Sequence, residues 1–332
     1  MQKLLIKGKR ELSGKISISG SKNATLPILA ASILAKKVRL KNIPLVKDIF
    51  TMIELLNFIG LKTKINKKSN IIEIKNNDKN INTLAPYKLV KTMRAGVLVL
   101  GSLLTKYGKA KVSLPGGCAI GTRPVDLHLF ALKKLGAKIK IKNGYIFAEA
   151  KKGLIGSKVK LPSISVGATE NVIIAASYAK GTSYIKNCAC EPEIKNLTDF
   201  LKKMGVKINW IGKRSVKIQG TQNLTNTKHR IMFDRIEAGT FVIAGALAAK
   251  KLIVTGIETK VMTKELNIIK KMGVKLRVGS GEVTVLNSQK IKPISITTEP
   301  YPGFPTDLQA QIMVLMTKAK GISKIKENIF EN

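Results

Sequence analysis

One pattern recurs four times along the chain and constrains its fold more than any other feature. In each copy a helix-like apolar run ends at a glycine, which is followed by an apolar residue, a lysine and an alternating stretch; the glycines are Gly60, Gly136, Gly205 and Gly273. Glycine after a helix is a C-cap signal, because it adopts the left-handed conformation without a Cβ clash. The pattern therefore predicts helix–turn–strand segments about 70 residues apart. Asn143-Gly144 predicts a hairpin turn in the second copy.

A second element, a helix rich in small residues, alternates with the first. Its copies are predicted to begin near Ala24, Thr92, Ala168, Glu237 and Asp307. Together the two elements make a βαβαββ unit of roughly 70 residues, which is too long for a solenoid repeat. Helices rich in Ala and Gly pack closely, so we expect an α/β protein of layered α+β repeats.

The two repeats are unequal in number, with five small-residue helices against four glycine-capped ones. The chain ends at Asn332 directly after the fifth of these helices and a strand, halfway through a unit. Compact repeat architectures close on whole units, so we expect a chain that is truncated at its C-terminus.

The charge of the chain is strongly positive, with 59 Lys+Arg against 20 Asp+Glu and a net charge of +39 over 332 residues. The excess is mostly lysine spread along the chain together with Ile and Asn, while arginine is scarce and aromatic residues are only 5%. Nucleic-acid readers favour arginine and stacked aromatics. We therefore expect no nucleic-acid partner, whereas an anionic small substrate fits the charge.

Length and hydropathy indicate about two packed domains and no membrane span. The longest apolar stretch, 238–249, is short and interrupted, and lysines break up the N-terminal region where a signal peptide needs an apolar run. The three cysteines make no disulfide framework, and Cys188 and Cys190 lack zinc-ligand spacing, so we interpret this pair as structural. We expect a soluble, cytoplasmic protein without a metal ion.

Three segments carry residues suited to chemistry. In 114–127 three glycines give mobility, and Cys118 lies near Arg123, whose charge favours the thiolate. Segment 19–24 precedes a helix and is either an anion site with Lys22 or an ordinary N-cap. Segment 304–309 places Asp307 at a helix start, as a cap or as a base. His128 and His229 stand alone and are interpreted as surface or core fillers.

Several of these segments resemble, in order along the chain, the UDP-N-acetylglucosamine enolpyruvyl transferase family of peptidoglycan synthesis. The similar segments are Gly20–Ala24, Lys91–Ala95, Leu114–His128, Glu191–Ile194, Asp234–Glu237 and Phe304–Asp307. The sister enolpyruvylshikimate phosphate synthases share the fold and chemistry but lack the cysteine loop, so such a transferase is the alternative. A decayed, inactive copy that acts only as a basic binding protein is the other alternative.

The resemblance implies an inside-out α/β barrel, in which two domains of three βαβαββ units each close over the substrates. Residues 22–231 would form the first domain, which carries the cysteine loop, and residues 1–21 plus 232–332 the second. By this pattern the second domain is incomplete and lacks further arginines that clamp phosphoenolpyruvate. We therefore expect the chain by itself to be poorly stable and weakly active or inactive.

The implied reaction adds the 3′-hydroxyl of UDP-N-acetylglucosamine to C2 of phosphoenolpyruvate and then eliminates phosphate. It requires an acid, a base and cations for the substrate anions. Cys118 matches the family's general acid, which also forms a covalent phosphoenolpyruvate adduct and is the target of fosfomycin. Asp307 matches the residue that handles the 3′-hydroxyl proton. Lys22, Asn23 and Arg123 match contacts to phosphoenolpyruvate and phosphate.

The resemblance also implies a nucleotide-sugar site. Its matching residues are Arg94, Arg123, Pro124, Val125, Asp126, Leu127, Ser163, Ile164, Ser165, Val166, Asp307 and Ile329. The only partners expected are the two small-molecule substrates, with no cofactor, nucleic acid or membrane, and the chain is expected to be a monomer. The implied role is in cell wall biogenesis, and through it in cell shape and cell division.

Overall fold

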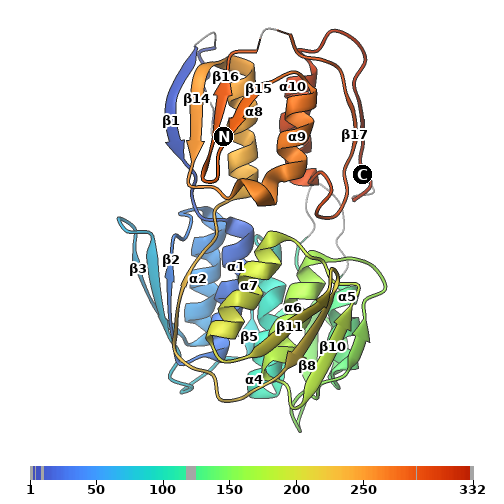
Figure 1. Cartoon of the computed structure of the whole chain (residues 1–332). Coiled ribbons are helices and arrows are strands. Elements are labelled where there is room, and N and C mark those ends of the chain that lie inside the picture. Colours follow the sequence, from blue (N-terminus) through green and yellow to red (C-terminus); the bar gives the residue numbers. More distant parts are fainter. Residues whose placement is uncertain (1–2, 4, 9–10, 117–124, 289, 330–332) are drawn as a thin grey trace. The chain divides into compact units, whose positions relative to one another are not determined.

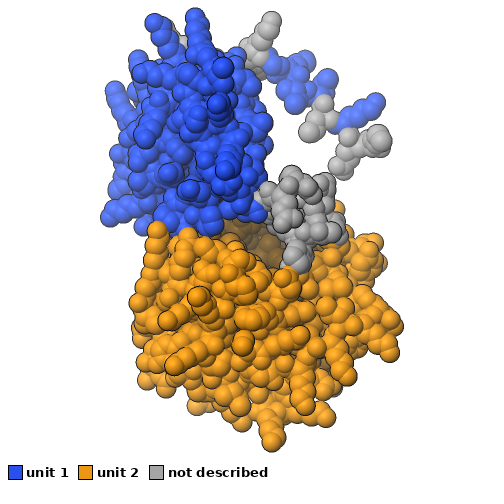
Figure 2. All heavy atoms as spheres, turned by 90° about the vertical axis from the view of Figure 1, so that its right-hand side faces the viewer, with its two compact units in different colours: residues 1–19, 233–331 blue, residues 20–232, 332 orange. Residues whose placement is uncertain are grey.

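The computed structural model describes the whole chain except residues 1–2, 4, 9–10, 117–124, 289 and 330–332. The described residues form two units, unit 1 with residues 1–19 and 233–331 and unit 2 with residues 20–232 (Figure 2). The chain thus starts in unit 1, crosses to unit 2 and returns. The predicted first domain, 22–231, lies within unit 2.

Unit 2 contains three four-stranded sheets, and each combines one parallel strand pair with antiparallel neighbours (Figure 1). The first sheet has the order β13-β2-β4-β3, with β13 Thr227–Arg230, β2 Lys37–Lys41, β4 Ile71–Lys75 and β3 Lys62–Asn66. The second is β5-β6-β8-β7, with β5 Leu84–Ala85, β6 Lys109–Ser113, β8 Tyr145–Glu149 and β7 Lys138–Lys142. The third is β11-β12-β10-β9, with β11 Lys207–Gly212, β12 Ser215–Gln219, β10 Thr182–Lys186 and β9 Lys158–Lys160. The shared strand pattern shows that unit 2 is a threefold structural repeat.

Each repeat of unit 2 contributes a small-residue helix and a glycine-capped helix. The small-residue helices are α1 Lys22–Ala31, α4 Val99–Tyr107 and α6 Val166–Tyr178; the glycine-capped ones are α2 Lys47–Ile59, α5 Asp126–Lys134 and α7 Pro192–Lys203. Short helical segments are η1 Ser32–Leu34, α3 Tyr87–Val90 and η2 Arg94–Leu98. Every residue of 24–31, 99–105 and 168–177 is buried. Because Ala, Gly and Ser let helices approach closely, these three helices form the core of the unit.

The predicted glycine caps are confirmed. Gly60, Gly136, Gly205 and Gly273 have φ of 113°, 96°, 100° and 88°. The strands that follow are β3, β7, β11 and, in unit 1, β15. Asn143 and Gly144, at φ 51° and 73°, form the predicted turn between β7 and β8.

Unit 1 contains one complete sheet and part of a further repeat. The sheet has the order β1-β14-β16-β15, with β1 Leu12–Ser17, β14 Ala249–Thr255, β16 Glu282–Leu286 and β15 Lys275–Val278. Its helices are α8 Arg235–Ala248, η3 Thr259–Met262 and α9 Thr263–Lys271. A parallel pair, β17 Ser295–Thr297 and β18 Lys324–Lys326, flanks η4 Thr306–Leu308 and α10 Gln309–Met316 in sequence. Among the described residues no helix is both long and apolar enough to cross a bilayer.

The two units exchange their first strands. β1 directly precedes α1 of unit 2 but pairs with β14 of unit 1, whereas β13 precedes α8 of unit 1 but pairs with β2 of unit 2. The crossing segments bind each other, because Ser21 N donates to Met232 O (2.8 Å) and Asp234 N donates to Ser19 O (2.9 Å). This exchange explains why the chain crosses between the units twice.

Candidate active site

The core helices of unit 2 run parallel to one another. Two hydrogen bonds join α4 to α1 and the following η1: Ser102 Oγ to Ala30 O (2.7 Å) and Lys106 Nζ to Ile33 O (3.1 Å). Two more join α4 to α6: Gly101 N to Asn171 Oδ1 (2.8 Å) and Thr105 Oγ1 to Ala175 O (2.9 Å). In these hydrogen bonds the residue numbers rise together along the helices, so the helices run in the same direction. Their N-termini, which carry partial positive charge, therefore lie at one end of the unit.

Lys22 and Asn23 lie at this end, in the first turn of α1. The Lys22 ammonium pairs with the Asp48 carboxylate at 3.1 Å, and the two side chains are 44% and 35% exposed. Ser21 is the N-cap, and its hydroxyl accepts from Ala24 N at 3.2 Å. Of the two alternatives for segment 19–24, the N-cap is confirmed for Ser21. It leaves Lys22 partly exposed, with its charge balanced by Asp48.

Arg94 is the first residue of η2 and is half-buried. The η2 segment packs against both α1 and α6, and it leads directly into α4. Arg94 thus lies at the end of unit 2 that also carries Lys22. Both predicted cations are close to helix N-termini, where an anion is stabilised by charge and by backbone dipoles together.

Two further groups of predicted residues begin helices at the same end. Asp126 and Leu127 form the start of α5, directly after the buried Val125. Segment 163–166 leads into α6, and Ser165 caps this helix by accepting from Ala168 N at 3.3 Å. The helices α5 and α6 are in contact, and the His128 ring of α5 lies against Gly167 in the first turn of α6. Cys118, Arg123 and Pro124 lie outside the described residues.

Asp307 and Ile329 lie in unit 1. Asp307 is exposed in η4, next to Thr306, whose hydroxyl donates to Glu327 Oε2 at 2.7 Å. The Ile329 N–H donates to the other oxygen of Glu327 at 2.5 Å. Glu327 therefore holds the two predicted residues near each other, whereas the other described site residues belong to unit 2.

His128 and Asn171 are buried partners that sequence reasoning missed. Asn171 Nδ2 lies 3.0 Å from His128 Nδ1. Burial lowers the pKa of His128 to about 4, although the nearby Asp126 opposes this shift. The available signal was a pair of polar residues, Glu170 and Asn171, within the otherwise apolar run of α6. His128 is thus a specific buried contact rather than a filler.

Three buried carboxyl groups gather where α6 and α7 begin: Glu170, Glu191 and Glu193. The starts of α6 and α7 are joined by a hydrogen bond from Ala189 N to Thr169 Oγ1 at 3.0 Å. Burial, with Glu193 and Glu191 nearby, raises the pKa of Glu170 well above its ordinary value. Glu170 therefore keeps its proton at a higher pH than an exposed glutamate, which limits the negative charge at this end.

Cys188 and Cys190 are buried free thiols, as the structural interpretation predicts. Burial raises the pKa of Cys188 to about 12, so that this thiol stays protonated and unreactive. Within the described ranges, no group of three or more His, Cys, Asp and Glu side chains could hold a metal ion.

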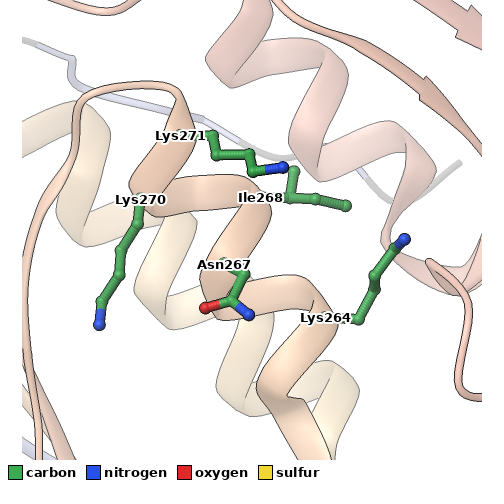
Figure 3. Close-up of a pocket in the computed structure, with 5 residues that line it drawn as sticks. All are labelled: Lys264, Asn267, Ile268, Lys270 and Lys271. Carbon is green, nitrogen blue, oxygen red and sulfur yellow. The ribbon is translucent and has the colours of Figure 1, made fainter.

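A hollow on unit 1 is separate from the predicted site residues. It is lined by Lys264, Asn267, Ile268, Lys270 and Lys271, which all extend from α9 (Figure 3). No second element contributes a lining residue, so the hollow is a shallow surface feature. Its lysines are solvated charges of one helix face, and the candidate site remains at the helix N-termini of unit 2.

The two buried histidines, His128 and His229, should make the protein less stable in mild acid. Burial also lowers the pKa of His229 to about 4, below the ordinary 6.5. Between pH 7 and pH 5 the two histidines therefore become protonated in the unfolded chain but stay neutral in the folded one. As a result, the free energy of unfolding falls by roughly 2 kcal/mol for each histidine. Above about pH 7 this contribution is constant, because both histidines are neutral in both states.

His229→Phe separates this effect from the titration of carboxylates. Neither ring nitrogen of His229 has a hydrogen-bond partner, and the ring meets Phe200 edge-on at 5.6 Å, so phenylalanine suits the site. Urea unfolding at pH 5, 6 and 7, followed by the fluorescence of Trp210, should show a shallower pH dependence in the variant. Equal pH dependence in variant and wild type would contradict the prediction.

The repeat-built units of this chain have the enolpyruvyl-transferase fold, which comparison with solved structures shows. The enolpyruvyl transferase NikO from Streptomyces tendae has the same fold, with a TM-score of 0.86 at 22% identity over 96% of this chain and 76% of NikO. The EPSP synthase of Acinetobacter baumannii gives a TM-score of 0.70 at 17% identity over 96% of this chain and 74% of that one. The predicted fold is thereby confirmed.

The chain belongs to the EPSP synthase (3-phosphoshikimate 1-carboxyvinyltransferase) family, whose model matches residues 6–332. A UDP-N-acetylglucosamine 1-carboxyvinyltransferase of Pelagibacter ubique (strain HTCC1062) is 58% identical over the full chain, which covers 79% of that protein. Another of that name, from Rickettsia bellii (strain OSU 85-389), is 47% identical with 80% of its length covered. The predicted class of enzyme, a transferase, is confirmed.

Proposed function

We propose that this chain transfers the enolpyruvyl group of phosphoenolpyruvate to the 3′-hydroxyl of UDP-N-acetylglucosamine and releases phosphate. This is the first committed step of peptidoglycan precursor synthesis, and we place it in the cytoplasm. The relatives that carry this activity in their names are 44–58% identical over the entire chain. The cysteine loop favours this substrate over shikimate 3-phosphate, because the sister family lacks that loop.

The observation that carries the proposal is the gathering of predicted ligand residues at one end of unit 2. Lys22, Arg94, Val125–Leu127 and Ser163–Val166 all lie where parallel helices begin. Both substrates are anions, one with a phosphate and a carboxylate and the other with a diphosphate. Helix N-termini and partly exposed cations attract such groups.

In the proposed reaction Cys118 is the general acid. Its thiol protonates C3 of phosphoenolpyruvate, and the resulting cation at C2 is attacked by the sugar 3′-hydroxyl, whose proton passes to Asp307. The tetrahedral adduct then loses a proton from C3 and expels phosphate, which restores the double bond. Lys22, Asn23 and Arg123 stabilise the phosphate and carboxylate charges during both steps. The same thiol is the proposed target of fosfomycin.

The test is phosphate release by the purified chain. Release from phosphoenolpyruvate should require UDP-N-acetylglucosamine and should fall at least about 100-fold in Cys118→Ser, which lacks an effective acid. Cys118→Asp is the matched control, because a carboxylic acid can still protonate C3 and should retain activity. Calorimetric binding of UDP-N-acetylglucosamine, measured in parallel, detects the nucleotide-sugar site even where turnover is slow.

Two outcomes would overturn the proposal. In one, the folded chain neither binds UDP-N-acetylglucosamine nor releases phosphate in its presence. In the other, phosphate release depends on shikimate 3-phosphate, which would assign the chain to the sister activity. Loss of activity in Cys118→Asp as well would leave the substrates unchanged but make the covalent adduct obligatory.

A further inference from the structure

Asn171 binds three separate backbone or side-chain groups in the core of unit 2. It is 0% exposed. Its Oδ1 accepts from Gly101 N (2.8 Å), its Nδ2 donates to Val97 O (3.2 Å), and the same Nδ2 lies 3.0 Å from His128 Nδ1. A side-chain amide has two N–H donors and one carbonyl acceptor. Because the Gly101 N–H can only donate, the amide has one permitted orientation, and its two N–H groups face Val97 and His128.

The orientation of Asn171 also fixes the His128 ring. Since Asn171 donates to Nδ1, that nitrogen accepts, and the proton of the neutral imidazole belongs on Nε2. Burial keeps the ring neutral by lowering the pKa of His128 to about 4. Nε2 lies against Gly167 in the first turn of α6, where an added Cβ would be 3.2 Å away. The ring thus fills the space between the starts of α5 and α6.

Asn171 also sits at the junction between η2 and α4. The N–H of Gly101 and the carbonyl of Val97 are the i and i−4 partners of a regular α-helix. The Asn171 amide binds both of them, at the point where the 3₁₀ segment gives way to the α-helix. A side chain inserted at a helical ladder sets the local helix geometry. Asn171 therefore fixes the position of η2, which begins with Arg94.

The three elements that Asn171 joins are those that carry the proposed nucleotide-sugar residues of unit 2. Val97 belongs to the segment of Arg94, His128 follows Val125–Leu127, and Asn171 itself follows Ser163–Val166. Asn171 is not itself one of these ligand residues, because it is buried in the helix core.

We propose that Asn171 is a positioning residue for the nucleotide-sugar site, holding η2 and the starts of α5 and α6 at the spacing that UDP-N-acetylglucosamine requires. This inference rests on the proposed function. Displacing binding groups by about 1 Å is enough to reduce their effect strongly. Loss of the Asn171 amide should therefore weaken the binding of the nucleotide sugar more than the binding of phosphoenolpyruvate.

Asn76 provides a matched control for the experiment. It is also buried in unit 2, and it also makes three hydrogen bonds: to Ile33 O (2.8 Å), to the Tyr107 hydroxyl (2.8 Å) and from Asp78 N (2.9 Å). It lies at the opposite end of the helices, near the end of α4. Asn76→Leu and Asn171→Leu make the same chemical change at the two ends, so both should lower the melting temperature.

The measurements are the dissociation constants of UDP-N-acetylglucosamine and of phosphoenolpyruvate, obtained by calorimetry on the full chain, together with thermal unfolding. Asn171→Leu should raise the dissociation constant of UDP-N-acetylglucosamine at least about tenfold, with a smaller change in the constant of phosphoenolpyruvate. Asn76→Leu should leave the nucleotide-sugar constant within about twofold of wild type. If Asn171→Leu fails to fold, Asn171→Asp replaces it, because aspartate keeps the acceptor for Gly101 but loses both donors; Asn76→Asp is then the control.

The outcomes separate the inference from the proposed function. Wild-type affinity in the Asn171 variant, or equal losses of affinity in the Asn171 and Asn76 variants, would overturn the positioning role while the proposed function stands. A folded wild-type chain that does not bind UDP-N-acetylglucosamine would overturn the proposed function, and the inference with it.

Discussion

Replacing Gly20 by alanine is expected to destabilise unit 2 by about 3 kcal/mol or more, because overpacking against a fixed backbone is costly. The new Cβ would fall on the backbone oxygen of Asn42, far inside contact distance. Asn42 cannot withdraw freely, since its side chain donates to Ile231 O at 3.0 Å. Gly20 itself lies between the hydrogen bonds that join the two crossing segments. Any shift must therefore disturb the crossing as well as β2.

Urea unfolding followed by Trp210 fluorescence measures this effect, because the single tryptophan of the chain lies in β11 of unit 2. Gly212→Ala, also in unit 2, is the matched control: an added Cβ there would lie 3.8 Å from Ser215 Cβ, an ordinary van der Waals contact. The control should change the free energy of unfolding by no more than about 0.5 kcal/mol. Similar midpoints for Gly20→Ala and wild type would show that the crossing adapts to a side chain.

Removing the carboxylate of Glu265 should cost unit 1 about 3–5 kcal/mol, because it takes one charge away from a buried ion pair. Arg235 Nη1 lies 3.2 Å from Glu265 Oε1, and the side chains are only 7% and 1% exposed. The pair joins the first residue of α8 to α9, and the Arg235 guanidinium also lies 5.7 Å from the ring centre of Tyr301. Glu265→Leu keeps most of the volume, so that the loss reports charge rather than a cavity.

Thermal unfolding by circular dichroism should show this loss of stability. Two further variants test whether the loss comes from the buried charge. Arg235→Met combined with Glu265→Leu should recover much of the stability, because both charges of the buried pair are then removed together. Asp199→Ala breaks the exposed pair with Lys202, whose atoms are 3.8 Å apart, and should cost no more than about 0.5 kcal/mol. Equal effects of Glu265→Leu and Asp199→Ala would mean that burial gives this pair no special importance.

Local sequence signals predicted the repeating elements well. The four glycine caps and the strands after them follow from chemistry within a few residues, and each appears where the sequence indicates. The exchange of β1 and β13 could not be predicted in this way. Their partners are distant in sequence, and neither strand has a pattern that distinguishes β14 from β2. Pairing of this kind is decided by tertiary packing rather than by local preference.

The candidate site likewise contains residues that could be predicted from the sequence and one, Asn171, that could not. Resemblance to a family supplied Lys22, Arg94 and Asp307, and the structure describes where each lies. It did not supply Asn171, because a buried asparagine in an apolar helix gives no indication of which groups it binds. The three partners of Asn171 precede it in the sequence by about 40 to 75 residues. Only the packing of the helices brings these groups together.

The strand exchange also sets an order of folding during synthesis. β1 pairs with β14, which follows it by roughly 230 residues, so at roughly 5–20 residues per second it waits tens of seconds for its partner. All strands and helices of unit 2 are made within that interval, since β13 ends at Arg230. Unit 2 can therefore close on the ribosome while β1 is still unpaired. The strand carries Gly14 and Lys15 at its centre, residues that discourage pairing with other chains during the wait.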